Sequence, residues 1–274
     1  MIPCLNDEER AATGPVARAL AATSDSSFTE GFRLCCGYYL LRFALDKADR
    51  IAAFRLRFAV FNLELKEGLE SAYQPGVDTD EFDPVCDHLI VEDVAEGKVV
   101  GTYRLQTGTI AEKHLGYYSA REFDFRPYEA LRAEMIELGR ACIDREHRST
   151  DVLYLLWRGI ARYALHHGAR YLVGCSSLTS QDPAHGSAVY ESLSRYLVDA
   201  PLRTRPQAAF AMPFVSAAGV SNHAPKLLRT YLSIGANICG PPAIDREFKT
   251  IDFLTLLDLQ SLHPRIRVRF LGGK

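Results

Sequence analysis

The stretch Glu137-Leu-Gly-Arg-Ala-Cys-Ile-Asp-Arg-Glu-His-Arg-Ser-Thr-Asp-Val152 joins a predicted strand directly to the most regular helix of the chain. Residues 135–143 are predicted as the strand. Residues 152–167 are predicted as the helix because their apolar side chains fall on one face: Leu153, Leu156, Trp157, Ile160, Ala161, Ala164 and Leu165. Gly168 follows as an expected C-terminal cap.

Further strands and helices are predicted on both sides of this unit. A hairpin is expected from strands at 88–94 and 99–106, which flank the turn Glu96-Gly97-Lys98. Other strands are expected at 38–45, 171–175 and 252–259, and helices at 51–65, 127–133, 188–197 and 226–234. Strands that alternate with helices, together with a hairpin, predict a mixed α/β sheet flanked by helices.

The chain length of 274 residues is compatible with one large domain or two small ones. The predicted elements from Tyr38 onward form one continuous unit. We therefore expect a single domain over residues 31–274, with a C-terminal extension. Residues 1–30 are expected to be a mobile tail or a loose helix.

Composition and charge exclude several classes of protein. A hydrophobic fraction of 47% supports a real core and argues against disorder throughout. A net charge of −2 argues against a globally basic nucleic-acid binder. No secretory signal or membrane-spanning run is recognised. The seven scattered cysteines are typical of reduced thiols, so a cytoplasmic protein is expected.

Common catalytic and cofactor motifs are absent. The sequence has no Walker A loop, Gly-x-Gly-x-x-Gly, His-Glu-x-x-His or Gly-x-Ser-x-Gly, and no bound metal or cofactor is expected. His88 and Asp93 have the spacing of a His–Asp acyltransferase pair, but a histidine that opens a strand is the favoured interpretation. Cys142 and Cys175 are expected to be small core residues, not nucleophiles.

Charged side chains on the predicted strands are the first candidates for a site. Alternation places Arg104 on the face opposite Tyr103 and Leu105, where it can face a cleft. Glu137 and Arg140 would face opposite sides of a regular strand. Both can serve one site only if the strand bulges, and Gly139 is a natural position for a bulge.

A second set of candidates is a cationic region. Residues 140–170 contain six arginines and three histidines against three acids. The segment that holds Arg145, His147 and Arg148 leads into a helix N-terminus, which favours phosphate. Arg158 and Arg162 lie four residues apart on the helix. A solvated helix face is the alternative interpretation.

Taken together, these stretches resemble amino-acid N-acyltransferases of the GNAT superfamily, the ornithine N-acyltransferase group in particular. The matching blocks are Phe61–Leu69, Asp80–Val91, Val99–Gly108, Glu137–Cys142, Leu156–Tyr163, Tyr171–Leu178 and Gly235–Asp245. A more distant resemblance to acyl-homoserine-lactone synthases involves Arg57, Phe61, Asp80, Asp83, Arg104, Glu137 and Arg140. The resemblance implies a GNAT-like α/β sandwich with a splayed central sheet.

The resemblance also implies roles for the candidate residues. Glu137 would be the general base, with Arg140 and Arg104 beside it; a structural ion pair between Glu137 and either arginine is the alternative. Acceptor binding would fall to Arg57, Phe61, Asp80, Asp83 and Asp87, and a solvated acidic loop is the alternative. The cationic residues Arg145, His147, Arg148, Arg158 and Arg162 would dock an acidic carrier protein.

The implied reaction transfers a 3-hydroxy fatty acyl group from the 4′-phosphopantetheine of acyl carrier protein to the α-amine of ornithine, which gives lyso-ornithine lipid. Residues 145–150 lack the glycines of a CoA pyrophosphate loop, which favours the carrier protein. The rival hypotheses are another acceptor amine (glycine, lysine or a homoserine-lactone precursor), a CoA-dependent acetyltransferase, or an inert carrier-binding module. Arg265, Arg267, Arg269 and Lys274 suggest peripheral contact with an anionic inner membrane face; a plain basic terminus is the alternative.

Overall fold

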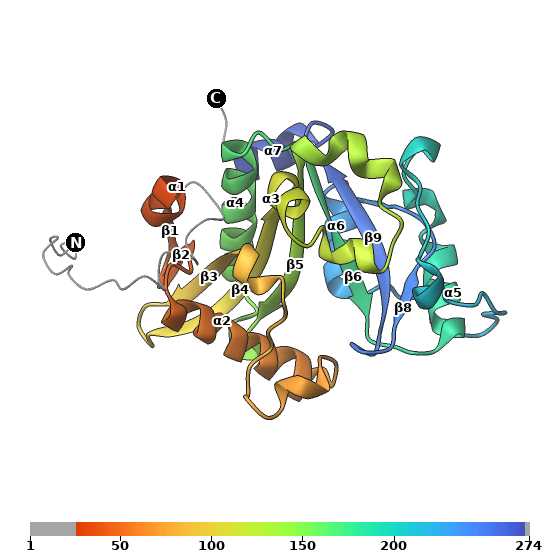
Figure 1. Cartoon of the computed structure of the whole chain (residues 1–274), viewed down its shortest axis with the longest axis horizontal. Helices are drawn as coiled ribbons and strands as arrows, with labels where there is room; N and C mark the ends of the chain where they lie inside the picture. The colour runs from red at the N-terminus through yellow and green to blue at the C-terminus, as the bar shows by residue number, and fades with distance from the viewer. Residues whose placement is uncertain (1–25, 272–274) are drawn as a thin grey trace, which may run out of the picture.

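Residues 26–271 are described by the structure, a computed structural model, while residues 1–25 and 272–274 lie outside the described part (Figure 1). Within the described part, nine strands form one sheet in the order β1-β2-β3-β4-β5-β6-β9-β7, and β8 also pairs with β9. The strands are β1 (Arg33–Cys36), β2 (Tyr39–Phe43), β3 (Asp87–Asp93), β4 (Lys98–Thr107), β5 (Met135–Ile143), β6 (Tyr171–Leu178), β7 (Asn237–Ile238), β8 (Ala243–Asp245) and β9 (Thr250–Asp258). Only β5 and β6 pair in parallel, so the predicted mixed sheet is confirmed.

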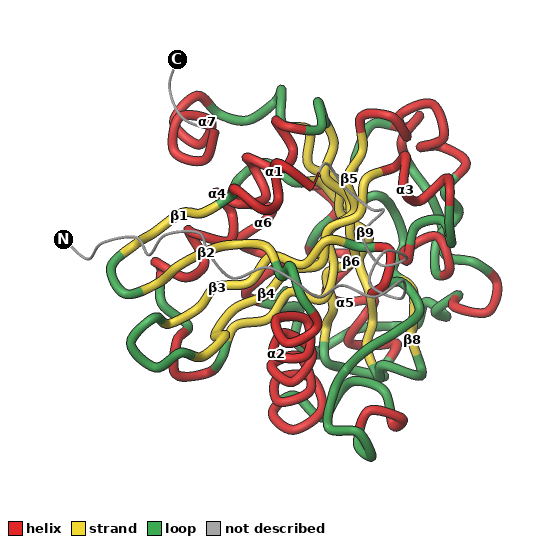
Figure 2. Tube along the Cα trace, turned by 60° about the vertical axis from the view of Figure 1, so that its left-hand side comes forward, coloured by secondary structure: helices red, strands yellow, loops and turns green. Residues whose placement is uncertain are grey.

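Helices cover both faces of the sheet. They are α1 (Ser26–Gly31), α2 (Lys47–Phe58), α3 (Gly108–Lys113), α4 (Thr150–His166), α5 (Pro183–Ser192), α6 (Lys226–Ser233) and α7 (Pro264–Leu271). A π-helix, Ala59–Glu64, continues α2. Short 3-10 helices occupy Glu70–Ala72, Asp83–Val85, Tyr118–Arg121, Arg126–Glu134, Arg145–His147, Ser194–Tyr196, Ala200–Leu202 and Ala208–Phe210. Figure 2 shows α2 on one side of the sheet and α4 and α6 on the other.

The sheet splays between its two central strands. β5 and β6 share only three Cα pairs, and the last joins Glu137 to Val173. Beyond that pair the two strands separate. Gly174 lies next to this point, where a Cβ atom would be 2.3 Å from the carbonyl oxygen of Leu138. A side chain at residue 174 would collide with β5.

A bulge in β5 re-aims the side chains that follow Glu137. The register between β4 and β5 shifts between Thr102 and Arg104. Arg140 has a φ of 50°, a left-handed conformation that a non-glycine residue rarely adopts. The predicted bulge is therefore confirmed, although Arg140 and not Gly139 takes the unusual backbone conformation.

The main core lies between the sheet and α4. Leu156, Ile160 and Tyr163 of α4 are buried against apolar residues of β2, β3 and β4. Leu165 is 52% exposed, so its predicted place on the apolar face is wrong. The buried face is centred on Leu156 and Ile160. It includes Tyr163 and leaves Leu165 outside.

Other differences concern the ends and the second half of the chain. Of the predicted tail, residues 1–25 lie outside the described part and residues 26–30 belong to α1, where Phe28 stacks on His166. The helix predicted at 188–197 begins earlier, at Pro183, because Asp182 caps its N-terminus. β1, β7, β8, α3 and α7 were not predicted. In the described part, no helix has the length and apolar character needed to cross a bilayer.

Candidate functional site

A cavity of about 320 Å³ lies where β5 and β6 separate. Its walls come from both faces of the sheet. On the α4 face the lining is mostly apolar: Tyr103, Trp157, Leu172, Leu227, Leu228 and Leu257. On the opposite face it is polar and includes Arg104, Gln106, Glu122, Glu137, Arg140, Asp245 and Asp252. We call these the apolar half and the polar half.

Glu137 lies in the polar half and is held by backbone. Its two carboxylate oxygens accept hydrogen bonds of 2.7 Å from the N–H groups of Tyr118 and Ser119. Burial raises the pKa of Glu137, and these bonds reduce that effect. The described ion pairs include none between Glu137 and Arg104 or Arg140, so the alternative of a structural ion pair is wrong.

Beside Glu137 lies a network of three arginines and three aspartates, which we call the paired cluster: Arg57, Arg104, Arg140, Asp78, Asp80 and Asp83. Arg57 binds Asp78 at 2.6 Å and Asp83 at 2.7 Å. Arg104 binds Asp80 at 2.6 Å and Asp83 at 3.1 Å. Arg140 binds Asp80 at 2.7 Å. The six charges cancel within the cluster.

The paired cluster changes the predicted roles of its members. Burial opposes ionisation of Asp83, yet Arg57 and Arg104 hold its pKa well below the usual value. Arg57 is fully buried, and neither it nor Asp80 nor Asp83 lines the cavity. Direct contact of these three side chains with an acceptor stays a prediction, and their internal ion pairs and their place outside the cavity wall do not favour it. Asp78 was not among the predicted site residues, because in the sequence it resembles any solvated acid of a loop.

The two remaining residues predicted for acceptor binding, Phe61 and Asp87, differ in whether they line the cavity. Phe61, on the π-helix, lines the cavity. Asp87 does not line it and instead accepts a 2.7 Å hydrogen bond from the hydroxyl of Tyr163. Its predicted contact with the acceptor stays a prediction that this position does not favour. Arg104 and Arg140 both reach the cavity wall, and Arg140 stacks over the ring of Phe248 at 4.2 Å.

A group of buried carboxylates in the polar half was not predicted. Glu122, Asp245 and Asp252 place one oxygen each within 4.8 Å of one another, a geometry that could hold a metal ion. We call them the acidic cluster. In the sequence, only Asp252 hints at this cluster, because it is a charged residue next to the apolar run Phe253–Leu257. Glu122 and Asp245 carry no such signal.

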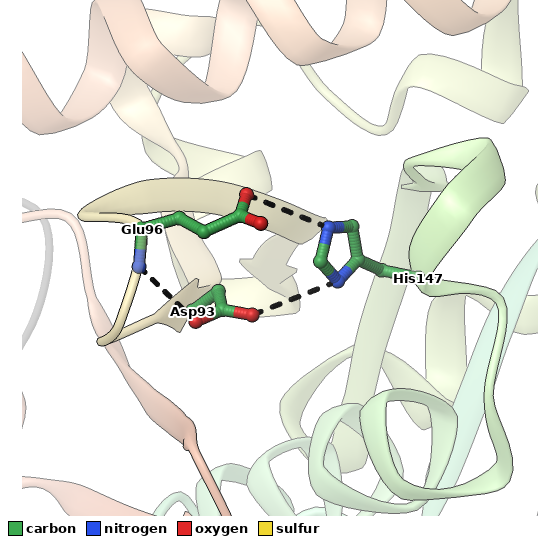
Figure 3. Close-up of side chains that lie close together, drawn as sticks. All are labelled: Asp93, Glu96 and His147. Carbon is green, nitrogen blue, oxygen red and sulfur yellow. Dashed lines mark hydrogen bonds and ion pairs between the residues drawn. The ribbon is translucent and has the colours of Figure 1, made fainter.

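The cationic region beside α4 is partly neutralised. Arg148 forms a 2.7 Å ion pair with Glu64. His147 accepts or donates a 3.1 Å hydrogen bond with the Tyr39 hydroxyl and lies between Asp93 and Glu96, at 3.8 and 3.9 Å (Figure 3). These two acids and His147 are a second group that could hold a metal ion. Arg145 and Arg162 are exposed, and Arg158 packs over Tyr154.

The two cysteines considered above are poor nucleophiles. Cys142 is buried, and burial raises the pKa of its thiol. Cys175 lines the cavity, but burial and the charges of Glu122 and Asp252 also raise its pKa well above the usual value.

Comparison with known proteins decides the family. Residues 56–158 match the model of the acetyltransferase (GNAT) domain. The L-ornithine N(alpha)-acyltransferase of Brucella abortus (strain 2308) is 35% identical over 243 residues, which cover 82% of this chain and 86% of that protein. This chain belongs to the GNAT N-acyltransferase family. A protein of the same name from Rhodobacter capsulatus is 31% identical over 84% of this chain and 93% of its own length.

A solved structure shares the fold. FeeM, an N-acyl amino acid synthase from uncultured soil microbes, superimposes with a TM-score of 0.52 at 12% sequence identity, and covers 82% of this chain and 93% of its own. The resemblance to a GNAT-like fold with a splayed sheet is thus confirmed. In this N-acyltransferase the matched residues, 56–158, include β5 and the first half of α4, with Trp157 of the cavity wall.

Proposed function

We propose that this N-acyltransferase transfers a 3-hydroxy fatty acyl group from acyl carrier protein to the α-amine of ornithine and forms lyso-ornithine lipid. The observation that carries the proposal is the division of one cavity into an apolar half and a polar half that meet at the splay. A fatty acyl chain suits the first, and a zwitterionic amino acid suits the second. The relatives named L-ornithine N(alpha)-acyltransferase support the choice of acceptor.

In the proposed reaction the acceptor nitrogen attacks the thioester carbonyl carbon. The carbon–sulfur bond then breaks, and the phosphopantetheine thiolate leaves. It becomes the thiol by taking up the second proton that the nitrogen loses as it becomes an amide. Glu137 accepts the proton that the α-ammonium must lose, directly or through water. Its raised pKa suits a base that works near neutral pH. Arg140 and Arg104, at the wall, would hold the acceptor carboxylate through charge-assisted hydrogen bonds.

The donor would enter from the carrier protein as fatty acyl-4′-phosphopantetheine. Pairing of β5 and β6 ends at Glu137 and Val173, which leaves later backbone groups of both strands outside that ladder to bind the pantetheine arm. Arg145, Arg158 and Arg162 would attract the acidic carrier protein. Arg148 and His147 contribute less, because acids of this chain lie beside them. Peripheral contact of α7 arginines with anionic lipid stays part of the proposal.

The experiment that tests the function is incubation of the purified full chain with 3-hydroxyacyl carrier protein and a panel of amino acids. We expect transfer to ornithine. Transfer from acetyl-CoA but not from the carrier protein would contradict the proposal, and so would efficient transfer only to glycine, lysine or a homoserine-lactone precursor. Carrier binding without transfer to any amine would identify an inert module.

The role of Glu137 is tested by the pH profile of Glu137→Gln. We expect turnover to fall by about 10²–10⁴-fold, since that is the range for loss of a general base, and the acidic limb of the kcat/KM profile to disappear. Circular dichroism checks that the turn at Tyr118 and Ser119 survives the change. An unchanged acidic limb would show that another group is the base.

A further inference from the structure

The acidic cluster brings three distant parts of the chain to one place. Glu122 follows the 3-10 helix at residues 118–121, Asp245 ends β8, and Asp252 lies in β9. Their side chains are almost completely buried, at 2%, 5% and 3% exposure. All three line the polar half of the cavity. The fold therefore places three buried carboxyl groups together at one end of the cavity.

Buried carboxylates normally form ion pairs with cations. Here Arg140 acts on Glu122 only through longer-range attraction. None of the ion pairs found among residues 26–271 includes Glu122, Asp245 or Asp252. Burial, the charges of Asp252 and Asp245 and a hydrogen bond to Asp252 raise the pKa of Glu122 well above its usual value, and the charge of Arg140 opposes this shift. Burial raises the pKa of Asp252 to about 6. Such a site is costly to keep without a cationic ligand.

Polar atoms in the same cavity also lack partners. Asp252 accepts a 2.9 Å hydrogen bond from Thr250 through Oδ2, but its Oδ1 has no hydrogen-bond partner. Gln106 is 2% exposed, lines the cavity on the face of Glu137, and has no partner for either atom of its amide. Arg140 Nε has no hydrogen-bond partner, although it forms a 3.6 Å ion pair with Asp78. Because buried polar groups are nearly always bonded, these atoms indicate a polar ligand.

The acidic cluster lies close to the proposed base. Ser119 donates its N–H to Glu137 at 2.7 Å, and its hydroxyl is 3.4 Å from Cys175 Sγ. That sulfur is 4.0 Å from a carboxylate oxygen of Glu122. Two side chains thus separate Glu137 from the cluster. A ligand with one amine beside Glu137 and a second cationic group a few bonds away can reach both.

We infer that Glu122, Asp245 and Asp252 bind the distal ammonium of a diamino acid acceptor and select for it over neutral amino acids. This inference rests on the proposed function and assigns its acceptor site. A primary ammonium has three N–H donors, which match three carboxylates. Asp245 uses one oxygen for the N–H groups of Glu247 and Phe248, at 2.8 and 3.0 Å, and keeps the other for the ligand.

The test compares ornithine with norvaline, which has the same carbon chain without the distal amine. kcat/KM is measured for both acceptors with saturating 3-hydroxyacyl carrier protein, for the wild type, Asp252→Asn and Glu122→Gln. Glu247→Gln is the matched control, because Glu247 is an exposed acid next to the cluster. We expect Asp252→Asn to lower the ornithine value by about 10²-fold or more and to leave norvaline within about twofold. Wild-type preference retained in both variants would overturn the inference.

A binding measurement separates this inference from the proposed function. Ornithine and norvaline are titrated calorimetrically into the full chain without donor. Tight binding of ornithine that Asp252→Asn weakens supports the acidic cluster even if the wild type transfers no acyl group. Equal binding of ornithine by the wild type and Asp252→Asn overturns it. Zn²⁺ or Mg²⁺ is titrated in parallel; a metal that binds only the wild type and excludes ornithine would identify a metal site and also overturn the inference.

Discussion

The paired cluster and the acidic cluster lie on the same face of one sheet and differ in a single respect. The first has three arginines for three aspartates, and the second has three carboxylates that form no ion pair with any of the described residues. Both are largely buried. The paired cluster mainly holds the scaffold together, although its Arg104 and Arg140 also reach the cavity wall. The acidic cluster forms no ion pair, which suits a cationic ligand. We therefore propose Asp252 and its neighbours, not Asp80 and Asp83, as the site for the distal ammonium of the acceptor.

Loss of an arginine from the paired cluster is the largest effect that we expect. Arg57→Ala leaves Asp78 and Asp83 buried without their main partner. The free energy of unfolding should fall by about 3–5 kcal/mol, measured by urea denaturation. Arg55→Ala, an exposed arginine on the same helix, is the control and should change it by under about 0.5 kcal/mol. A small effect of Arg57→Ala would mean that these pairs are not structural.

Removal of a charge from the acidic cluster should raise the free energy of unfolding, the opposite of the effect of Arg57→Ala. The folded pKa of Asp252, about 6, lies above its ordinary value of 3.8, so ionisation of Asp252 costs stability as the pH rises through that interval. Asp252→Asn should therefore raise the free energy of unfolding by about 1–3 kcal/mol at pH 7.5 and by much less at pH 4. Thermal unfolding of both proteins at the two pH values measures this. A lower melting temperature for Asp252→Asn at pH 7.5 would contradict the account.

A change in the apolar half should affect neither cluster. Leu227, in α6, lines the cavity and is partly exposed, so a larger side chain can be placed there without disrupting the core. Leu227→Trp should shift the donor preference toward shorter acyl chains, by about 0.8 kcal/mol for each CH₂ no longer buried. Competition between carrier proteins with different acyl chains measures it, with Leu165→Trp on exposed α4 surface as control. The preference for ornithine over norvaline should not change; if it does, the two halves are not independent.

The smallest effect should come from an exposed ion pair next to the paired cluster. Arg121 and Glu81 form an ion pair whose side chains are about half exposed. Arg121→Ala should lower the free energy of unfolding by under about 1 kcal/mol, since water and salt screen such pairs. Urea denaturation at two ionic strengths measures it. A loss as large as that for Arg57→Ala would show that burial is not what distinguishes the clusters.

Local patterns in the sequence were sufficient to predict the centre of the sheet. The hairpin of β3 and β4 has a strong turn signal, and α4 has a clear apolar face. The bulge near Gly139 was predicted because Glu137 and Arg140 could share a site only through it. These features depend on residues close together in the chain.

The missed features depend on distant residues. β7 and β8 have two and three residues and pair with the distant strand β9. The acidic cluster joins residues about 120 positions apart, so no spacing in the sequence reveals it. Conversely, the run of acids at 80–87 resembles a cation site. Its charges are neutralised by Arg57, Arg104 and Arg140, and only the fold shows that pairing.

The most direct test of which cluster serves the acceptor is a crystal structure with N-(3-hydroxyacyl)ornithine bound. The account predicts the acyl chain in the apolar half, the amide at the splay beside Glu137, and the distal ammonium within hydrogen-bond distance of Glu122 and Asp252. A distal ammonium bound at Asp80 or Asp83, or an acyl chain outside the cavity, would contradict it.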